Sequence, residues 1–167
     1  MGLKDSKDIV LSFDMSTEEF HRIPLPDNVQ RVNSYLKRLA VWNESVSLFF
    51  SPEKTQNSLS FEIWVMNDYS TSVEGPSWTK HSTVGPLVGI HSPIAFWKRD
   101  ELLMDTKDGG VVSYNLGTKR LRDFPIYGVR PGSCHAENYM GNLFSFKRKG
   151  TRLAQMKRQV TLLCHVE

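Results

Sequence analysis

Short apolar runs rich in β-branched and aromatic residues alternate with polar turns along the chain, and one such pattern occurs twice. Residues 10–23 (VLSFDMSTEEFHRI) align without a gap with residues 111–124 (VVSYNLGTKRLRDF). In both copies, a run ending on an aromatic residue is followed by Asp14 or Asn115. These short polar side chains can accept hydrogen bonds from the backbone amides ahead and so open a turn. A second short run follows the turn, so each copy predicts a β-hairpin.

A looser third copy lies between these two. Residues 63–67 align with residues 10–14, the connection that follows is longer, and the return strand begins at Trp78. The three copies start at positions 10, 63 and 111. This spacing is close to that of kelch-type propeller blades, which repeat at about 50 residues and contain four strands each.

The segments between the copies supply the remaining strands, at residues 39–42, 46–50, 94–97 and 102–104. A final strand is predicted from Asn138 to Phe146. The sequence therefore predicts an all-β fold of antiparallel hairpin repeats of about 50 residues, a partial kelch-like β-propeller. Two four-strand units are preceded by half a unit, so we expect the domain to be incomplete at its N-terminus.

These repeats resemble the F-box-associated interaction domains of plant F-box proteins, in particular S-locus F-box and S-locus-F-box-like proteins. The blocks occur in the order expected for that family. The segments that carry the resemblance are 9–20, 23–26, 61–69, 77–80, 96–98, 100–104, 113–115, 139–140, 142–143 and 145–146.

The resemblance implies a non-catalytic domain that recruits a protein substrate to a cullin-RING ubiquitin ligase. In the family, an N-terminal F-box binds the ligase adaptor, and S-locus members recruit a pistil S-ribonuclease in self-incompatibility. This chain departs from the family by leaving no room for an F-box, through which alone the adaptor would bind. It also continues past the closing strand, so we expect an F-box-associated β domain over residues 1–146 and a basic C-terminal tail over 147–167.

Charge is unevenly distributed along the chain. The net charge is +3, yet the residues up to Leu143 carry 15 basic against 17 acidic side chains. A nucleic-acid-binding body would be expected to show a basic surface instead, so no nucleic-acid partner is predicted. The six tail cations are Lys147, Arg148, Lys149, Arg152, Lys157 and Arg158, against one acid, Glu167.

Other features of the sequence favour a chain of the cytoplasm or nucleus. No stretch approaches the roughly 18 apolar residues of a membrane span, and the polar N-terminus does not resemble a secretory signal. No membrane partner is therefore expected. Cys134 and Cys164 are too few for a disulfide scaffold, and we expect them to be reduced thiols.

No residue set predicts catalysis, a cofactor or a metal. The histidines lack the spacing of zinc ligands, and neither a nucleophile elbow nor a phosphate-binding loop occurs. Large aromatic side chains dominate core packing, so structural roles are expected for the four tryptophans, Trp42, Trp64, Trp78 and Trp97.

The tail allows two interpretations. Lys147 to Lys149 could act as a nuclear signal or contact an anionic surface, and Leu153, Met156, Val160 and Leu163 recur at helical spacing. The simpler interpretation is a divergent extension that is partly disordered or packs weakly.

Recognition is expected on the loops, because variable connections on a rigid scaffold usually carry binding residues. Which loops form the partner-binding face is unknown from the sequence. An alternative function is a sugar-binding protein or enzyme on a propeller scaffold, and a further one is a non-functional truncated F-box protein. The candidate loops are Asp27 to Leu36, Ser51 to Ser60, Asp68 to Ser77, Val84 to Ser92 and Val129 to Ala136.

Overall fold

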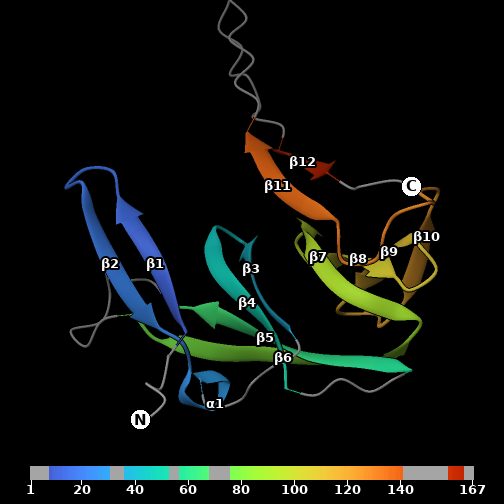
Figure 1. The fold of residues 1–167 in the computed structure, drawn as a ribbon, viewed down its shortest axis with the longest axis horizontal. Helices are drawn as coiled ribbons and strands as arrows, with labels where there is room; N and C mark the ends of the chain where they lie inside the picture. Colours follow the sequence, from blue (N-terminus) through green and yellow to red (C-terminus); the bar gives the residue numbers. More distant parts are fainter. Residues whose placement is uncertain (1–7, 31–35, 53–56, 68–75, 141–157, 164–167) are drawn as a thin grey trace, which may run out of the picture. The chain divides into compact units, whose positions relative to one another are not determined.

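The computed structural model describes residues 8–30, 36–52, 57–67, 76–140 and 158–163, and these segments form strands joined by turns and one short helix (Figure 1). The elements are β1 (Ile9–Asp14), β2 (Glu19–Pro24), α1 (Asp27–Gln30), β3 (Leu36–Trp42), β4 (Ser45–Ser51), β5 (Ser58–Met66), β6 (Trp78–Val88), β7 (Ile90–Lys98), β8 (Glu101–Thr106), β9 (Val111–Asn115), β10 (Leu121–Phe124), β11 (His135–Met140) and β12 (Arg158–Leu163).

The strands form antiparallel sheets in the arrangement that the repeats predict. A two-stranded sheet, β1-β2, comes first and is followed by two four-stranded sheets, β3-β4-β5-β6 and β7-β8-β9-β10. The predicted all-β fold of two four-strand units preceded by half a unit is therefore confirmed. The chain divides into two compact units, Met1–Val88 and Gly89–Glu167.

The two aligned copies form the same hairpin turn. The Asp14 carboxylate accepts hydrogen bonds from the amide of Ser16 at 2.7 Å and from its hydroxyl at 2.6 Å. In the second copy, Asn115 Oδ1 accepts from the amide of Thr118 at 2.8 Å. The residues that begin each return, Glu18 and Lys119, both have positive φ angles, 57° and 59°. The shared polar position thus produces the shared turn, as predicted from the sequence.

The turn gives a testable pH dependence. Hydrogen bonds from Ser16, followed by that from the Thr17 amide, lower the pKa of Asp14 from its ordinary value of 3.8. The stabilisation is therefore fully present above pH 3.8 and is lost as pH falls through the lower folded pKa. We expect Asp14→Asn to retain stability at pH 7, because an amide oxygen can accept the same hydrogen bonds, as Asn115 Oδ1 does from the Thr118 amide that corresponds to that of Thr17.

Denaturant unfolding between about pH 2 and 6 measures this effect. Wild-type stability should decline relative to Asp14→Asn below the ordinary carboxyl pKa. Parallel curves for the two proteins over this range would contradict the assignment.

In the first unit, a hydrophobic cluster joins the hairpin β1-β2 and α1 to the four-stranded sheet. Two points fasten the hairpin: the Trp78 indole N–H donates to the Pro24 carbonyl at 2.8 Å, and Lys37 pairs with Asp8 at 2.6 Å. The helix contributes a fully buried Val29. The cluster consists of Leu25, Val29, Leu48 and Phe50, with Val10, Trp64 and Trp78 packed against it.

In the second unit, the core lies on the sheet β7-β8-β9-β10 and on the segment that follows β10. Trp97 meets Phe124 edge-on at a ring-centroid distance of 5.5 Å. The buried members of the core cluster are Ile94, Ala95, Leu103, Val111, Val129 and Cys134, with Trp97, Phe124 and Ile126 packed against them.

Two predictions, about one connection and about the closing strand, are wrong in part. The segment from Val84 to Ser92 is not a loop, because β6 continues to Val88 and β7 starts at Ile90. Only Gly89 separates them, with a φ of 77° that glycine adopts readily. The closing strand begins at His135, three residues earlier than expected, and residues 141–146 lie outside the described residues.

The helical interpretation of the tail is also wrong for its last part. Val160 and Leu163 lie in β12, which pairs antiparallel with β11 from His135↔Leu163 to Met140↔Arg158. The run contains β-favouring Val and Thr, and an open partner strand supplies backbone hydrogen bonds that override a weak helical spacing. Leu153, Met156 and the basic cluster at 147–149 lie outside the described residues. The domain boundary at residues 146/147 stays a prediction.

Candidate protein-binding loops

Three connections meet at one end of the sheet β7-β8-β9-β10. The Lys107 amide in the β8-β9 turn donates to the Gly89 carbonyl at 2.8 Å, which joins that turn to the start of β7. The Val129 amide donates to the Gly109 carbonyl at 3.0 Å, which joins the same turn to the segment after β10. We call residues 125–134 the anchored loop, because backbone hydrogen bonds and the following side chain hold it to the sheet.

Asp105 on β8 is the centre of this anchoring. Its side chain is only 1% exposed. Its Oδ1 accepts from the Ser92 amide at 2.8 Å and from the Ser92 hydroxyl at 2.7 Å, and its Oδ2 accepts from the Gly132 amide. The His91 ring nitrogen Nδ1 lies 3.6 Å from the same Oδ2. A buried carboxylate with several donors is stable only while those donors are held in place, so Asp105 ties the anchored loop to β7 and β8.

Gly132 is required at this contact for two reasons. Its φ is +81°, in the region that side chains disfavour, and an added Cβ would lie 2.9 Å from His91 Cε1. Such an atom would push the His91 ring away from the loop. The close approach of the Gly132 backbone to Asp105 thus depends on the missing side chain.

The anchored loop presents its outer residues to solvent. Val129 is buried at 2% exposure, whereas Tyr127 is 72% exposed. Arg130 and Pro131 are also exposed, as is Lys107 on the adjoining turn. Tyr and Arg are enriched among the residues that dominate protein–protein binding energy, and a rigid backbone lowers the entropy cost of binding. The arrangement suits recognition of another protein.

The shifted pKa values have structural causes. Hydrogen bonds, first that from the Thr106 hydroxyl, lower the pKa of Asp108 in the β8-β9 turn. Burial raises the pKa of the Tyr114 hydroxyl. Within the described segments, no group of three or more His, Cys, Asp or Glu side chains could hold a metal ion. The one helix in these segments, α1, is four residues long and cannot cross a membrane.

The structure agrees with some of the binding loops predicted from the sequence and differs from others. Val129 to Ala136 forms much of the anchored loop, although its last two residues belong to β11. Asp27 to Gln30 forms α1 instead of an open loop. The segment from Ser51 to Ser60 is not a loop at its ends, because Ser51 ends β4 and β5 begins at Ser58, and Leu36 already belongs to β3. Residues 31–35, 53–56 and 68–75 lie outside the described residues. Sequence reasoning missed residues 125–128, for which the Pro125 and Gly128 turn signals were available.

The tryptophans pack as expected, but Cys134 differs from the sequence expectation. Trp64 and Trp78 join the first core, and Trp97 joins the second. The Trp42 ring packs against that of His81 at a centroid distance of 4.2 Å, with the two planes tilted by 51°. Cys134 is buried and disulfide-bonded, which corrects the expected reduced thiol. Cys164 lies outside the described residues.

Antiparallel four-stranded sheets that follow one another along the chain are the repeating unit of β-propeller domains. The particular family follows from its sequence pattern: the chain belongs to the F-box associated beta propeller domains, whose pattern matches residues 2–142. No curated protein and no solved structure shows a significant match to the chain.

Proposed function

We propose that the chain is a non-catalytic, protein-binding domain that recruits a substrate to a cullin-RING ubiquitin ligase when joined to an F-box. The family match supports the recruiting role, and the single structural observation that carries it is the anchored loop with its exposed Tyr127 and Arg130. In this proposal the substrate is an S-ribonuclease-like protein, the setting is plant self-incompatibility, and the chain acts in the cytoplasm or nucleus.

The anchored loop explains how a non-catalytic domain would bind a protein partner. Tyr127 offers a large amphipathic ring that loses little conformational entropy on binding. Arg130, three residues along the same loop, offers up to five donors in a planar group suited to carboxylates and carbonyls. Because Asp105 fixes the loop before the partner arrives, both side chains are presented from a preorganised backbone.

The binding prediction can be tested with a purified pistil S-ribonuclease as the probe. We expect Tyr127→Ala and Arg130→Ala each to weaken its binding by at least about tenfold in calorimetric titration, as for residues at the centre of an interface. Arg122→Ala on β10, also exposed, is the matched control and should change binding less than about twofold.

Equal loss in Arg122→Ala and Arg130→Ala would contradict a specific role for the anchored loop. A probe that does not bind the wild-type chain at all would remove the S-ribonuclease assignment. The ligase assignment is tested separately: fusion to an F-box should make the chain co-purify with a cullin adaptor, and failure to do so would remove that part.

A further inference from the structure

Two turns of the complete four-stranded sheet β7-β8-β9-β10 carry most of its exposed positive charge. One turn joins β7 to β8, and the other joins β9 to β10. We call residues 98–101 and 116–122, which comprise these turns and the start of β10, the basic turns. Against the two acids Asp100 and Glu101, they present five exposed cations: Lys98, Arg99, Lys119, Arg120 and Arg122.

The two turns lie side by side. The Leu116 amide donates to the Asp100 carbonyl at 2.8 Å, which joins one turn to the other. The Asn115 amide donates to the Arg120 carbonyl at 2.9 Å, and Asn115 is the register partner of Glu101. Neighbouring strands are about 4.8 Å apart, so the bases of these cations lie within roughly 10 Å, about one screening length at 0.1 M salt. Their fields therefore add.

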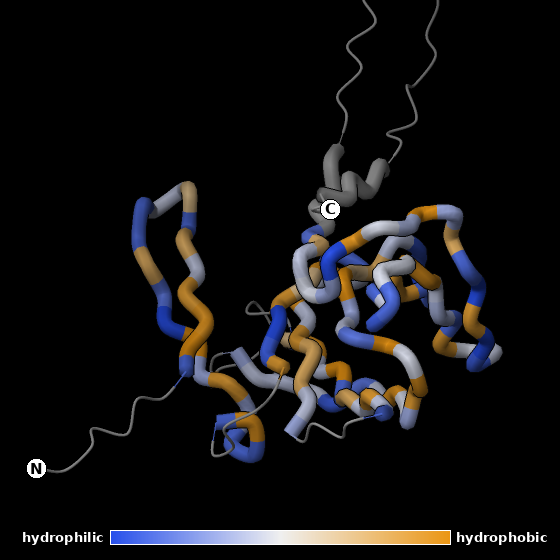
Figure 2. Tube along the Cα trace, turned by 45° about the vertical axis from the view of Figure 1, so that its right-hand side comes forward, coloured by the Kyte–Doolittle hydropathy of each residue, from blue (hydrophilic) through white to orange (hydrophobic). Residues whose placement is uncertain are grey.

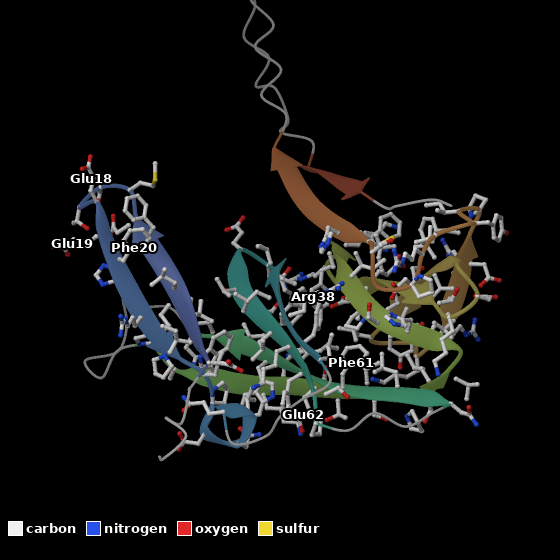
Figure 3. All side chains as sticks on the ribbon, in the orientation of Figure 1. Glu18, Glu19, Phe20, Arg38, Phe61 and Glu62 are labelled. Carbon is white, nitrogen blue, oxygen red and sulfur yellow. The ribbon has the colours of Figure 1, made fainter. Side chains whose placement is uncertain are left out.

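The repeat shows that the fold does not require this charge. The turn of hairpin β1-β2 has the same geometry, because Glu18 and Lys119 have φ angles of 57° and 59°. Its residues have the opposite charge: Figure 3 shows Glu18 and Glu19 at the turn end of the hairpin, where Figure 2 shows hydrophilic residues. In the ungapped alignment, Glu18, Glu19 and His21 correspond to Lys119, Arg120 and Arg122. The same backbone thus forms with acids or with cations.

Most of the positive charge of the basic turns is not neutralised locally. Lys98 Nζ lies 3.7 Å from Glu101 Oε2. Asp123 follows Arg122 on β10 and points to the opposite face of the strand. In the part of the chain that the structure describes, three cations have no acidic ion-pair partner: Lys119, Arg120 and Arg122. The basic turns are therefore a cationic surface on a chain whose residues up to Leu143 contain more acids than bases.

We propose that the basic turns bind an acidic segment of a partner protein. Exposed arginines suit this role, because the guanidinium group can donate two parallel hydrogen bonds to one carboxylate. The exposed Asp100 lies among the cations and would repel a phosphate backbone, whereas a polypeptide can place a neutral or basic residue there. The five cations are also fewer than the 6–10 phosphate contacts common in nucleic-acid complexes. Charge complementarity thus favours a protein partner.

This surface is separate from the anchored loop. The anchored loop lies at the end of the sheet that contains Thr106 and Val111, and the basic turns lie at the end that contains Glu101 and Asn115. Strand β8 spans six residues between these ends, a length of roughly 17 Å. The inference therefore goes beyond the proposed recruiting role and does not depend on it. A domain with both surfaces would hold its target at one end and an acidic protein at the other.

Fluorescence anisotropy of the full chain with a labelled peptide of alternating Glu and Ser, about 12 residues long, tests the proposal. The peptide should bind at about 0.05 M salt and dissociate at about 1 M salt, where screening acts within about 3 Å. Lys119→Glu and Arg120→Glu should each weaken binding at least about fivefold, because an attraction becomes a repulsion. Both variants should fold, since Glu18 and Glu19 occupy the equivalent turn.

The matched control is Arg22→Glu, which makes the same charge change at an exposed position on β2 and should alter peptide binding less than about twofold. Arg122→Ala should weaken binding of the acidic peptide but not of the S-ribonuclease, and Arg130→Ala should do the reverse. Failure of the S-ribonuclease to bind would remove that target and leave the peptide result unchanged.

Three outcomes overturn the proposal. The first is a wild-type chain that does not bind the acidic peptide at low salt. The second is tighter binding of an oligothymidylate of equal charge, which would assign the basic turns to nucleic acid. The third is a loss in Arg22→Glu as large as that in Arg120→Glu, which would reduce the effect to net charge. If Lys119→Glu or Arg120→Glu fails to unfold cooperatively, Arg122→Ala decides.

Discussion

Replacing Asp105 by alanine is expected to lower the free energy of unfolding by roughly 3–5 kcal/mol. The change leaves the amides of Ser92 and Gly132 and the Ser92 hydroxyl without the carboxylate that they now share. Each buried donor left without an acceptor costs about 1–3 kcal/mol. Denaturant unfolding gives the total loss. Hydrogen exchange at the Gly132 amide reports release of the anchored loop.

Asp105→Asn distinguishes the hydrogen bonds that Oδ1 accepts from Ser92 from the one that Oδ2 accepts from Gly132. The amide oxygen can still accept from Ser92, but its NH₂ group would then face the Gly132 N–H, a donor against a donor. We therefore expect an intermediate loss of about 1–3 kcal/mol with faster exchange at Gly132. Asp123→Asn, an exposed position on β10, is the matched control and should stay within about 0.5 kcal/mol of the wild type. A loss at Asp105 no larger than at Asp123 would refute the anchoring role.

Leu48→Ala is expected to destabilise the first unit by about 2–5 kcal/mol, because it removes buried methyl groups and leaves a cavity. Leu48 is 2% exposed and lies in the cluster with Leu25, Val29 and Phe50 that joins the sheet to the hairpin and α1. The loss should therefore loosen β2 and α1 as well as β4. Thermal or denaturant unfolding measures the stability, and hydrogen exchange along β2 measures the loosening.

The control for Leu48→Ala is Leu39→Ala on the neighbouring strand. Leu39 on β3 is the register partner of Leu48 but is 47% exposed. Leu39→Ala removes the same atoms from the same sheet, mostly from contact with water, and should cost less than about 1 kcal/mol. Similar losses for the two variants would mean that the cluster does not fasten the hairpin.

The hairpins and their order in the chain were predictable because they depend on local chemistry. Asp14 and Asn115 open their turns through hydrogen bonds to residues two or three positions ahead. Because donor and acceptor are close along the chain, the residue types alone predict these contacts. The same holds for the turn at Gly109, where a φ of 85° requires glycine. The repeat of these signals also gave the number of strands in each unit.

The candidate site was only partly predictable, because it depends on contacts between distant positions. The Gly132 amide binds Asp105, 27 residues away, and the anchored loop packs Val129 on a turn formed by residues 106–110. Nothing near Asp105 in the sequence shows that its carboxylate is buried. The end of the chain was mispredicted for a related reason: the spacing of Val160 and Leu163 fits a helix, but pairing with β11 made them a strand.

The sequence by itself determined the repeated hairpins of this protein, the all-β class and the family to which it belongs, since each follows from residue types at short spacing. Only the tertiary structure decided which polar groups are buried and which loop is held rigid with Tyr127 and Arg130 outward. These depend on how strands distant in the sequence pack, and a carboxylate such as Asp105 acquires its role only when its donors are brought around it.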